Sequence, residues 1–198
     1  MERILLTGFE PFSNSSVNPS QEVIKKIVHP SLIAKEVLPV TFYGAAKRSI
    51  ELIELHTPTV VLALGQATGI SQIAAEQVAI NLDDARIPDN EGNAPQDRAI
   101  VPDGPDAYFT TLPIKKIVDR LNDSAIPASI SLSAGTFVCN HIFYSIQHHC
   151  IGKGIKSGFI HLPLMQEQST EFPGLPTMSI DEIVRGITLV IDLLNEAN

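Results

Sequence analysis

The residue best suited to covalent chemistry is Cys139, which lies where an apolar strand gives way to a helix. Residues 128–132 alternate small and apolar side chains, which predicts a buried strand. Ala134 and Gly135 then allow a tight turn, and the apolar spacing over residues 141–151 predicts a helix. Cys139 is therefore expected in the first helical turn, where free backbone N–H groups and the helix dipole favour a thiolate. This position predicts a nucleophile; the alternative is a small buried hydrophobic residue.

A cysteine nucleophile needs a base, and the chain offers six histidines. They are His29, His56, His141, His148, His149 and His161. Only His161 ends an apolar strand, and the carboxyl ends of strands are where sites form in open α/β sheets. His141 is two residues from Cys139 and points away from it on a helix, while His148 and His149 lie far from the first turn. His29 and His56 are expected as cations at helix C-termini. His161 is thus the predicted base, its alternative being a satisfied core histidine.

The base in turn needs a carboxylate to orient it, and three are candidates. Glu76 interrupts the apolar stretch 73–80, and a carboxylate entering a buried strand is costly unless it is paired. Asp83 and Asp84 follow closely and compete with it. The residues by themselves leave this choice open.

Metal and phosphate sites are poorly supported. Cys139, His141, His148, His149 and Cys150 would spread around one helix, without the paired spacing of a tetrahedral zinc site. The segment GQATG at residues 65–69 follows a strand but lacks a Walker lysine and the dinucleotide glycine spacing. The residues therefore favour neither a metal site nor a phosphate-binding loop.

A ligand pocket is suggested by the first loop, which carries Phe9 and Phe12 and then Asn18. Two phenylalanines after the carboxyl end of a strand suit a flat apolar ligand, or else form a lid over the core. Two long segments break the alternation of elements. Residues 83–108 are polar and rich in Pro and Gly, and Arg86 within them points to function; residues 165–178 are expected to be a surface loop.

The remaining pattern alternates strands with helices, which predicts a three-layer α/β/α sandwich with a mixed, mostly parallel central sheet. Strands are expected at residues 4–7, 33–40, 59–65, 76–82 and 157–162, and helices at 19–29, 43–56, 114–121 and 180–194. Asn18 is the expected cap of the first helix, and Ser179 with Glu182 forms a capping box before the last. Val190 and Leu193 lie off the main apolar stripe of the last helix, which predicts an additional buried face and an oligomer.

Composition narrows the function class. The 198 residues suit a single domain, and the net charge of −8 argues against nucleic acid and anionic membranes as partners. No apolar run is long enough for a membrane span or a signal peptide. Cys139 and Cys150 lie about 16 Å apart on one expected helix, too far for a disulfide. A reduced, cytoplasmic protein is therefore expected.

An ordered set of motifs along nearly the whole chain resembles pyroglutamyl peptidase type I, the pyrrolidone-carboxylate peptidase family. The matching segments are TGFEPF at 7–12, NPS at 18–20, GQA at 65–67, Glu76 with VAIN at 78–81, DARIPDN at 84–90, DGP at 103–105, YF at 108–109, TLPIK at 111–115, AGTFVCNH at 134–141 and FIH at 159–161. The resemblance implies a cytoplasmic cysteine peptidase that removes an N-terminal 5-oxoproline residue from peptides. It implies Cys139 as nucleophile, His161 as base and Glu76 as the orienting carboxylate. It also implies a tetramer without metal or cofactor.

The same resemblance suggests how the substrate is held. A neutral lactam suits aromatic walls from Phe9, Phe12 and Phe137, with Val138 beside them. Asn18 and the backbone near Gln66 are candidate hydrogen-bonding partners. The backbone N–H of Cys139 would be an oxyanion donor, and Arg86 would stabilise charge nearby.

Two positions depart from the family pattern, which often has arginine where this chain has Ile70 and Gln77. Neither position is catalytic, so the departure concerns local ion pairing or substrate preference. Two alternatives remain on the same fold: a non-catalytic protein that binds pyroglutamyl ends or free 5-oxoproline, and an acyl transferase that uses the same thiolate.

Overall fold

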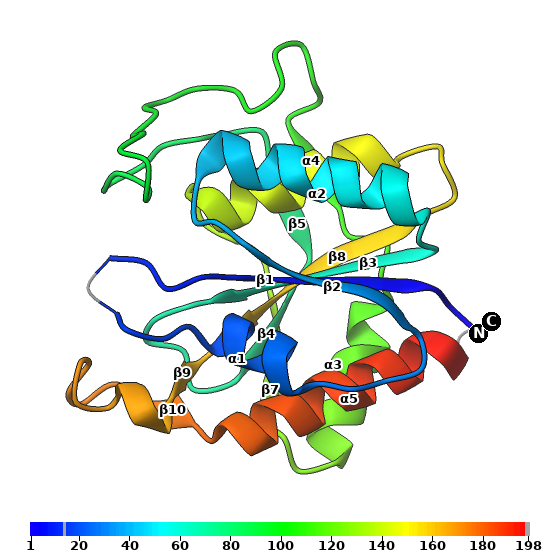
Figure 1. Cartoon of the computed structure of the whole chain (residues 1–198), viewed down its shortest axis with the longest axis vertical. Coiled ribbons are helices and arrows are strands. Elements are labelled where there is room, and N and C mark those ends of the chain that lie inside the picture. The colour runs from blue at the N-terminus through cyan, green and yellow to red at the C-terminus, as the bar shows by residue number, and fades with distance from the viewer. Residues whose placement is uncertain (14, 197–198) are drawn as a thin grey trace.

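A six-stranded sheet forms the middle layer of the computed structural model, which describes residues 1–13 and 15–196 (Figure 1). From one edge to the other, the strands are β2 (Leu32–Leu38), β1 (Ile4–Phe9), β3 (Val60–Gln66), β8 (Lys156–Leu162), β4 (Ile73–Glu76) and β7 (Ala128–Ser131). Neighbouring strands are parallel except β4 and β8, which pair antiparallel. The predicted mixed, mostly parallel sheet is confirmed.

Helices cover both faces of this sheet (Figure 1). On one face lie α2 (Phe42–His56) and α4 (Val138–Cys150); on the other lie α1 (Pro19–Lys26), α3 (Ile114–Asp123) and α5 (Ile180–Glu196). The strands between them alternate: Leu5 joins the core under α2 and α4, whereas Ile4 and Leu6 join the core under α1 and α5. A strand covered on both faces must be apolar at every position, which is why these strands read as continuous apolar runs.

The strand predicted at residues 76–82 is wrong as a single element. The chain instead changes sheets at Gln77, whose N–H donates to Ser131 O at 2.8 Å and whose carbonyl accepts from Thr110 N at 2.9 Å. Before it, β4 belongs to the large sheet; after it, β5 (Val78–Ile80) pairs antiparallel with β6 (Ala107–Phe109). Apolar alternation does not reveal which neighbour a strand pairs with, so it merged two strands into one.

The segment predicted as a surface loop at residues 165–178 contains a little regular structure. It begins in β9 (Leu164–Met165), continues through a 3₁₀ turn (Gln166–Gln168), and ends in β10 (Thr177–Met178), which pairs with β9. This small motif packs beside the start of α5.

Helix ends follow the expected local chemistry. The Asn18 side chain accepts from Ser20 N at 3.0 Å with Pro19 opening α1, and Ser179 Oγ accepts from Glu182 N at 3.2 Å before α5. His56 is the last residue of α2, as expected. His29 lies beyond the end of α1, so the prediction that it occupies the helix C-terminus is wrong; its Nε2 lies 3.0 Å from Asp192 Oδ1.

The apolar side chains that lie off the main stripe of α5 are buried by other parts of the same chain. Val190 is 1% exposed and Leu193 is 7% exposed, so the additional face is buried, as predicted, but it is buried within the same chain. Both α1 and α3 pack against α5, which therefore needs a wider apolar arc than a helix lying on a sheet alone.

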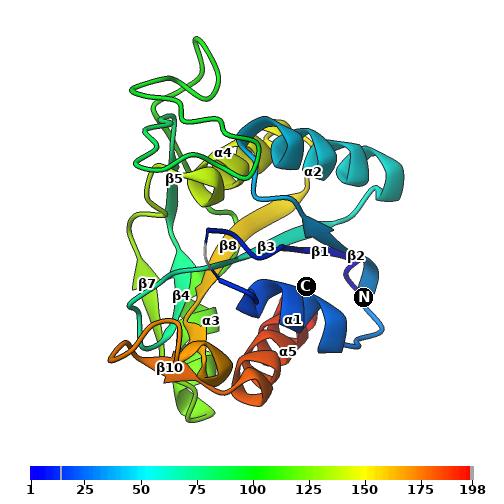
Figure 2. The ribbon, with the colours of Figure 1, turned by 60° about the vertical axis from the view of Figure 1, so that its left-hand side comes forward.

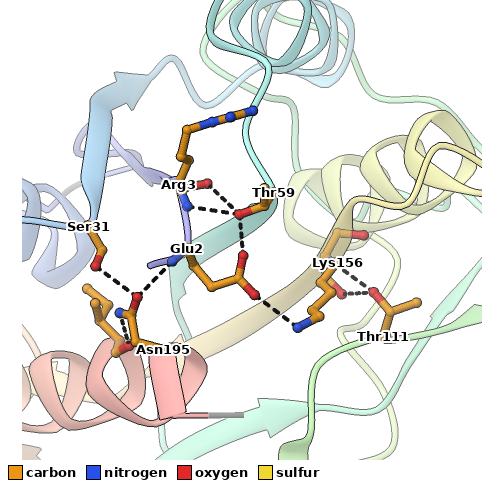
Figure 3. A network of polar contacts seen from close by, with 9 residues as sticks. Glu2, Arg3, Ser31, Thr59, Thr111, Lys156 and Asn195 are labelled. Atoms are coloured by element: carbon orange, nitrogen blue, oxygen red, sulfur yellow. Dashed lines mark hydrogen bonds and ion pairs between the residues drawn. The ribbon is translucent and has the colours of Figure 1, made fainter. Parts of the chain in front are cut away.

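A polar network fixes the ends of the chain near the amino ends of the strands (Figure 3). The buried Glu2 carboxylate lies 3.0 Å from Lys156 Nζ and accepts from Thr59 Oγ1, while Glu2 N donates to Asn195 Oδ1 at 2.9 Å. Ser31 Oγ donates to the same Asn195 oxygen at 3.0 Å. The network joins the segment before β1 to β8 and α5, so the start of the chain lies beside the end of α5 (Figure 1).

Within the described part of the chain, no helix is both long and apolar enough to cross a membrane.

Candidate active site

Cys139 is the second residue of α4, and it lies against the carboxyl end of β3. Gly135 turns the chain before the helix with a φ of +76°, a conformation that favours glycine. At Gly65 a Cβ would lie 2.9 Å from Cys139 Sγ and 2.7 Å from Phe159 Cζ. The absence of a side chain there lets the thiol approach the sheet closely.

The start of α4 suits an anion. Its N-cap residue, Phe137, provides no side-chain hydrogen bond, so no side chain competes for the N–H groups of the first turn. These groups and the helix dipole stabilise negative charge on Cys139 Sγ or on an oxyanion bound beside it.

His161 lies next to this thiol at the end of β8, in register with Gly65 on β3. Its Nδ1 forms a 2.7 Å hydrogen bond with Glu76 Oε1, and the ring lies close enough to Cys139 for the two groups to interact electrostatically. A carboxylate only accepts, so Nδ1 carries the proton of that bond and Nε2 is left to serve the thiol. Glu76 is 1% exposed and His161 is 7% exposed. Cys139, His161 and Glu76 are thus brought together at one site.

The groups around His161 favour the charged form of its imidazole. Burial acts to lower the pKa of His161, but hydrogen bonds to Cys139 and Glu76, with the charges on both groups, outweigh it and raise the pKa to about 10. At neutral pH the arrangement therefore favours the imidazolium form of His161. An imidazolium at this position can donate a proton.

The sequence left open which of three carboxylates orients His161, and the structure places each of them differently. Asp83 Oδ2 lies 2.8 Å from His141 Nδ1, so this aspartate holds a different histidine. Asp84 is exposed, and its backbone pairs with Thr136. Glu76 reaches His161 because β4 and β8 are antiparallel neighbours.

A cavity of about 880 Å³ opens over these groups. Every residue predicted for the site lines it: Phe9, Phe12, Asn18, Gln66, Glu76, Arg86, Phe137, Val138, Cys139 and His161. The structure thus brings together segments spread over most of the chain. Ile70 also lines the cavity, whereas Gln77 is not among the lining residues.

Aromatic rings form one wall of the cavity. The rings of Phe12 and Phe137 have centroids 6.2 Å apart, and Phe42 supports Phe137 edge-on at 5.2 Å. Phe9 is only 2% exposed and contributes mainly to the core beneath. The polar atoms of Asn18 are occupied, since Oδ1 accepts from Ser20 and Nδ2 donates to Glu10 O at 3.0 Å. Asn18 therefore shapes the loop that carries the phenylalanines.

Gln168 is a supporting residue that sequence reasoning missed. Its side chain is fully buried, and Nε2 lies 2.9 Å from both Gln66 Oε1 and Ser15 Oγ. Its Oε1 accepts from Met165 N at 2.9 Å. Gln168 thereby ties the segment after β8 to two loops that border the cavity. A glutamine in a polar, proline-rich segment carries no periodic signal that would have revealed this role.

The loop containing Arg86 is fixed on both sides. Asp84 pairs with Thr136 before α4, and Asn90 Nδ2 donates to Glu10 Oε1 at 2.9 Å. Arg86 itself is exposed between these anchors. Its position beside the cavity makes it a candidate source of positive charge there.

The two cysteines differ sharply in environment. Cys139 is half-buried and lines the cavity, whereas Cys150 is 3% exposed and burial raises the pKa of its thiol to about 11. Both are free thiols. Among the residues described by the structure, no group of three or more His, Cys, Asp or Glu side chains is arranged to hold a metal ion.

Comparison with known proteins identifies the family. The family model for pyroglutamyl peptidase matches residues 2–197. The chain belongs to the pyroglutamyl peptidase family. It is 47% identical to the pyrrolidone-carboxylate peptidase of Vibrio parahaemolyticus, over 98% of this chain and 93% of that protein. It is 45% identical to that of Bacillus mycoides, over 99% and 94% respectively.

Solved structures of pyroglutamyl peptidases share the fold. Pyroglutamyl peptidase I from Bacillus amyloliquefaciens is 41% identical with a TM-score of 0.91, over 96% of this chain and 92% of that one. A mutant pyrrolidone carboxyl peptidase from the hyperthermophile Pyrococcus furiosus is 39% identical with a TM-score of 0.93, over 98% and 99%. The α/β fold and the assignment as a peptidase therefore rest on matches along almost the entire chain.

Proposed function

We propose that this protein is a cysteine exopeptidase that removes the N-terminal pyroglutamyl (5-oxoproline) residue from peptides. The observation that carries the proposal is that Cys139, His161 and Glu76 line one cavity in a member of the pyroglutamyl peptidase family, with His161 hydrogen-bonded to Glu76. One catalytic domain would span residues 1–198.

The pocket suits this neutral, flat group. A pyroglutamyl terminus lacks the ammonium that ordinary aminopeptidases bind, so its site needs apolar walls and a few hydrogen bonds rather than a carboxylate. Phe12 and Phe137 supply the walls, and Phe9 and Val138 line the cavity from the core beneath. The backbone near Gln66 would provide hydrogen bonds to the lactam, with Asn18 holding the adjoining loop.

Acylation begins when Cys139 Sγ attacks the pyroglutamyl carbonyl carbon and forms the C–S bond. The carbonyl oxygen takes the negative charge and accepts a hydrogen bond from the Cys139 N–H, with Arg86 adding positive charge nearby. When the tetrahedral intermediate collapses, the C–N bond breaks and His161 donates its proton to the leaving amine. The products are a pyroglutamyl thioester and the shortened peptide.

Deacylation uses the same residues. His161, now neutral, takes a proton from water as the water oxygen attacks the thioester carbon. The C–S bond then breaks, 5-oxoproline leaves, and the thiolate and imidazolium are restored. Throughout, Glu76 holds the ring with Nε2 toward the reaction and stabilises its charge.

We also propose that the enzyme works in the cytoplasm as a homo-oligomer, a tetramer by family resemblance, without metal or cofactor. Sedimentation at micromolar concentration tests the assembly, and a monomer there would contradict it. Activity that persists after extensive treatment with a chelator is expected; its loss would contradict the metal-independent mechanism.

The deciding experiment measures release of a chromophoric amine from its pyroglutamyl amide, with the corresponding prolyl amide as the matched control. Wild type should hydrolyse the pyroglutamyl compound selectively, and Cys139→Ser should be slower by at least about a thousandfold. Tight binding without turnover by folded, reduced protein would instead support a pyroglutamyl-binding protein. Transfer to added amines that exceeds hydrolysis would support an acyl transferase.

A further inference from the structure

The cavity continues beyond His161 across two more strands. Ala74 on β4 is in register with His161 on β8 and with Ser129 on β7, so these three side chains form one row on the same face of the sheet. In the next row along β4, Glu76 is in register with Ser131. All five residues line the cavity, and β7 is the edge strand, so the rows run out to the edge of the sheet (Figure 2).

This extension is formed by small, uncharged side chains, Ala74, Ser129 and Ser131, which we call the β4–β7 shelf. The helix α4 packs mainly over β3, β5, β6 and β8, and the shelf is left to line the cavity. A volume of about 880 Å³ lies within the range of roughly 300–1,000 Å³ that accepts drug-sized ligands. A single five-membered lactam leaves much of that space for whatever is attached to it.

The proposed chemistry determines which part of the substrate lies there. His161 donates its proton to the leaving nitrogen, so that nitrogen must lie beside the imidazole. The aromatic wall of Phe12 and Phe137 holds the lactam, whereas the shelf extends from His161 across β4 to β7. The chain attached to the leaving nitrogen therefore begins over the shelf.

We propose that the β4–β7 shelf binds the residue that follows pyroglutamate and selects peptides in which that residue is uncharged; this inference rests on the proposed function. A charged side chain placed on the shelf would lose hydration and meet no opposite charge from Ala74, Ser129 or Ser131. Glu76 beside Ser131 and His161 beside Ala74 are paired with each other, and Asp84 and Arg86 belong to the loop fixed beside α4.

The first test compares kcat/KM for three pyroglutamyl dipeptide amides that differ only in whether alanine, lysine or glutamate follows pyroglutamate. Wild type should cleave the alanine peptide at least about fivefold faster than either charged one, as expected for an unpaired charge at a partly exposed site. Equal rates for all three would overturn the proposed selectivity.

The second test places a charge on the shelf. In Ser129→Asp the lysine-to-glutamate ratio of kcat/KM should rise about five- to tenfold relative to wild type, and in Ser129→Lys it should fall similarly. The ratio within one variant cancels any common effect on the triad. Leu132 is the matched control, because it follows β7, is 71% exposed and is not among the cavity-lining residues. The same changes at Leu132 should alter the ratio less than about twofold, as for other surface charges.

Two failures can be told apart. In the first, the enzyme cleaves all the peptides, but the substitutions at Ser129 change the lysine-to-glutamate ratio of kcat/KM no more than those at Leu132 do. That result would overturn the proposed role of the shelf and leave the proposed function standing. No cleavage of any pyroglutamyl peptide or chromophoric amide by wild type would overturn the proposed function itself. Should the Ser129 variants not fold, the same substitutions at Ser131 supply the same ratio.

Discussion

Two buried carboxylates in this molecule hold a histidine in nearly the same way, yet we assign chemistry to only one pair. Glu76 Oε1 lies 2.7 Å from His161 Nδ1, and Asp83 Oδ2 lies 2.8 Å from His141 Nδ1. All four residues are at most 7% exposed. A carboxylate–imidazole pair is therefore not by itself evidence of an active site.

The difference lies around the rest of each ring. His161 interacts electrostatically with Cys139 and lines the cavity with it, whereas the ring of His141 packs against Phe42 and Tyr43 at centroid distances of 5.6 and 5.9 Å. Asp83 also pairs through its backbone with Arg98. The Asp83–His141 pair thus ties a long loop to α4, and the Glu76–His161 pair serves a thiol.

The largest expected contrast extends this comparison to the two cysteines of α4. Iodoacetamide should alkylate Cys139 at least about a thousandfold faster than Cys150 at neutral pH, because a pKa of about 11 and burial keep the Cys150 thiol protonated. Mass spectrometry of peptides over time measures both rates, and activity should decline with Cys139 modification. Comparable rates at the two positions would contradict the assigned environments.

The second prediction concerns the Asp83–His141 pair as a structural contact. Asp83→Asn should lower the free energy of unfolding by about 2 kcal/mol, since it weakens a buried, charge-assisted hydrogen bond. Urea denaturation measures the change, and the exposed Asp84→Asn is the control, with an effect within about 0.5 kcal/mol. Equal effects at the two positions would mean that the buried pair contributes no specific stability.

The third prediction uses the alkaline limb of the pH–rate profile. The imidazolium form of His161 persists below its pKa, so kcat/KM should hold until pH rises through about 10 and then fall. Glu76→Gln removes a hydrogen bond and a charge that raise this pKa, so its limb should move to lower pH by at least about one unit. Asp83→Asn should leave the limb in place. A limb unaffected by Glu76→Gln would show that another group sets it.

The smallest effect is expected at a third buried carboxylate, Glu2, at the other end of the strands. Its partner Lys156 is 38% exposed, so Glu2→Gln should cost about 1 kcal/mol in the free energy of unfolding. Urea denaturation tests this, and kcat/KM should stay within about twofold of wild type. A large loss of activity in this variant would contradict the separation of the two ends of the sheet.

Much of this comparison could be anticipated from the sequence. The strand–turn–helix pattern placed Cys139 in a first helical turn, and His161 at the end of an apolar strand followed from the same topology. Both signals are local, because they depend on turn residues and on the periodicity of short segments. The roles of Asn18 and Ser179 as caps of two different helices were likewise predictable from neighbouring residues in the sequence.

What the sequence left open depends on pairing between distant segments. Choosing Glu76 over Asp83 requires knowing that β4 runs antiparallel beside β8, and the merged strand at residues 76–82 concealed that register. The buried position of Val190 and Leu193 depends on α1 and α3 packing against α5. Gln168 acquires its role from three hydrogen bonds to segments far from one another in sequence. None of these arrangements produces a periodic pattern of residues in the sequence.

The most direct test of the central claim measures kcat/KM for a pyroglutamyl chromophoric amide in Glu76→Gln and Asp83→Asn, each at a temperature where the variant is folded. Both changes convert a buried carboxylate beside a histidine into an amide. We expect at least about a hundredfold loss for Glu76→Gln, as when the orienting group of a triad is removed, and less than about a fivefold loss for Asp83→Asn. Equal losses in the two variants, or near-wild-type activity in Glu76→Gln, would contradict the assignment of catalysis to the Glu76–His161 pair alone.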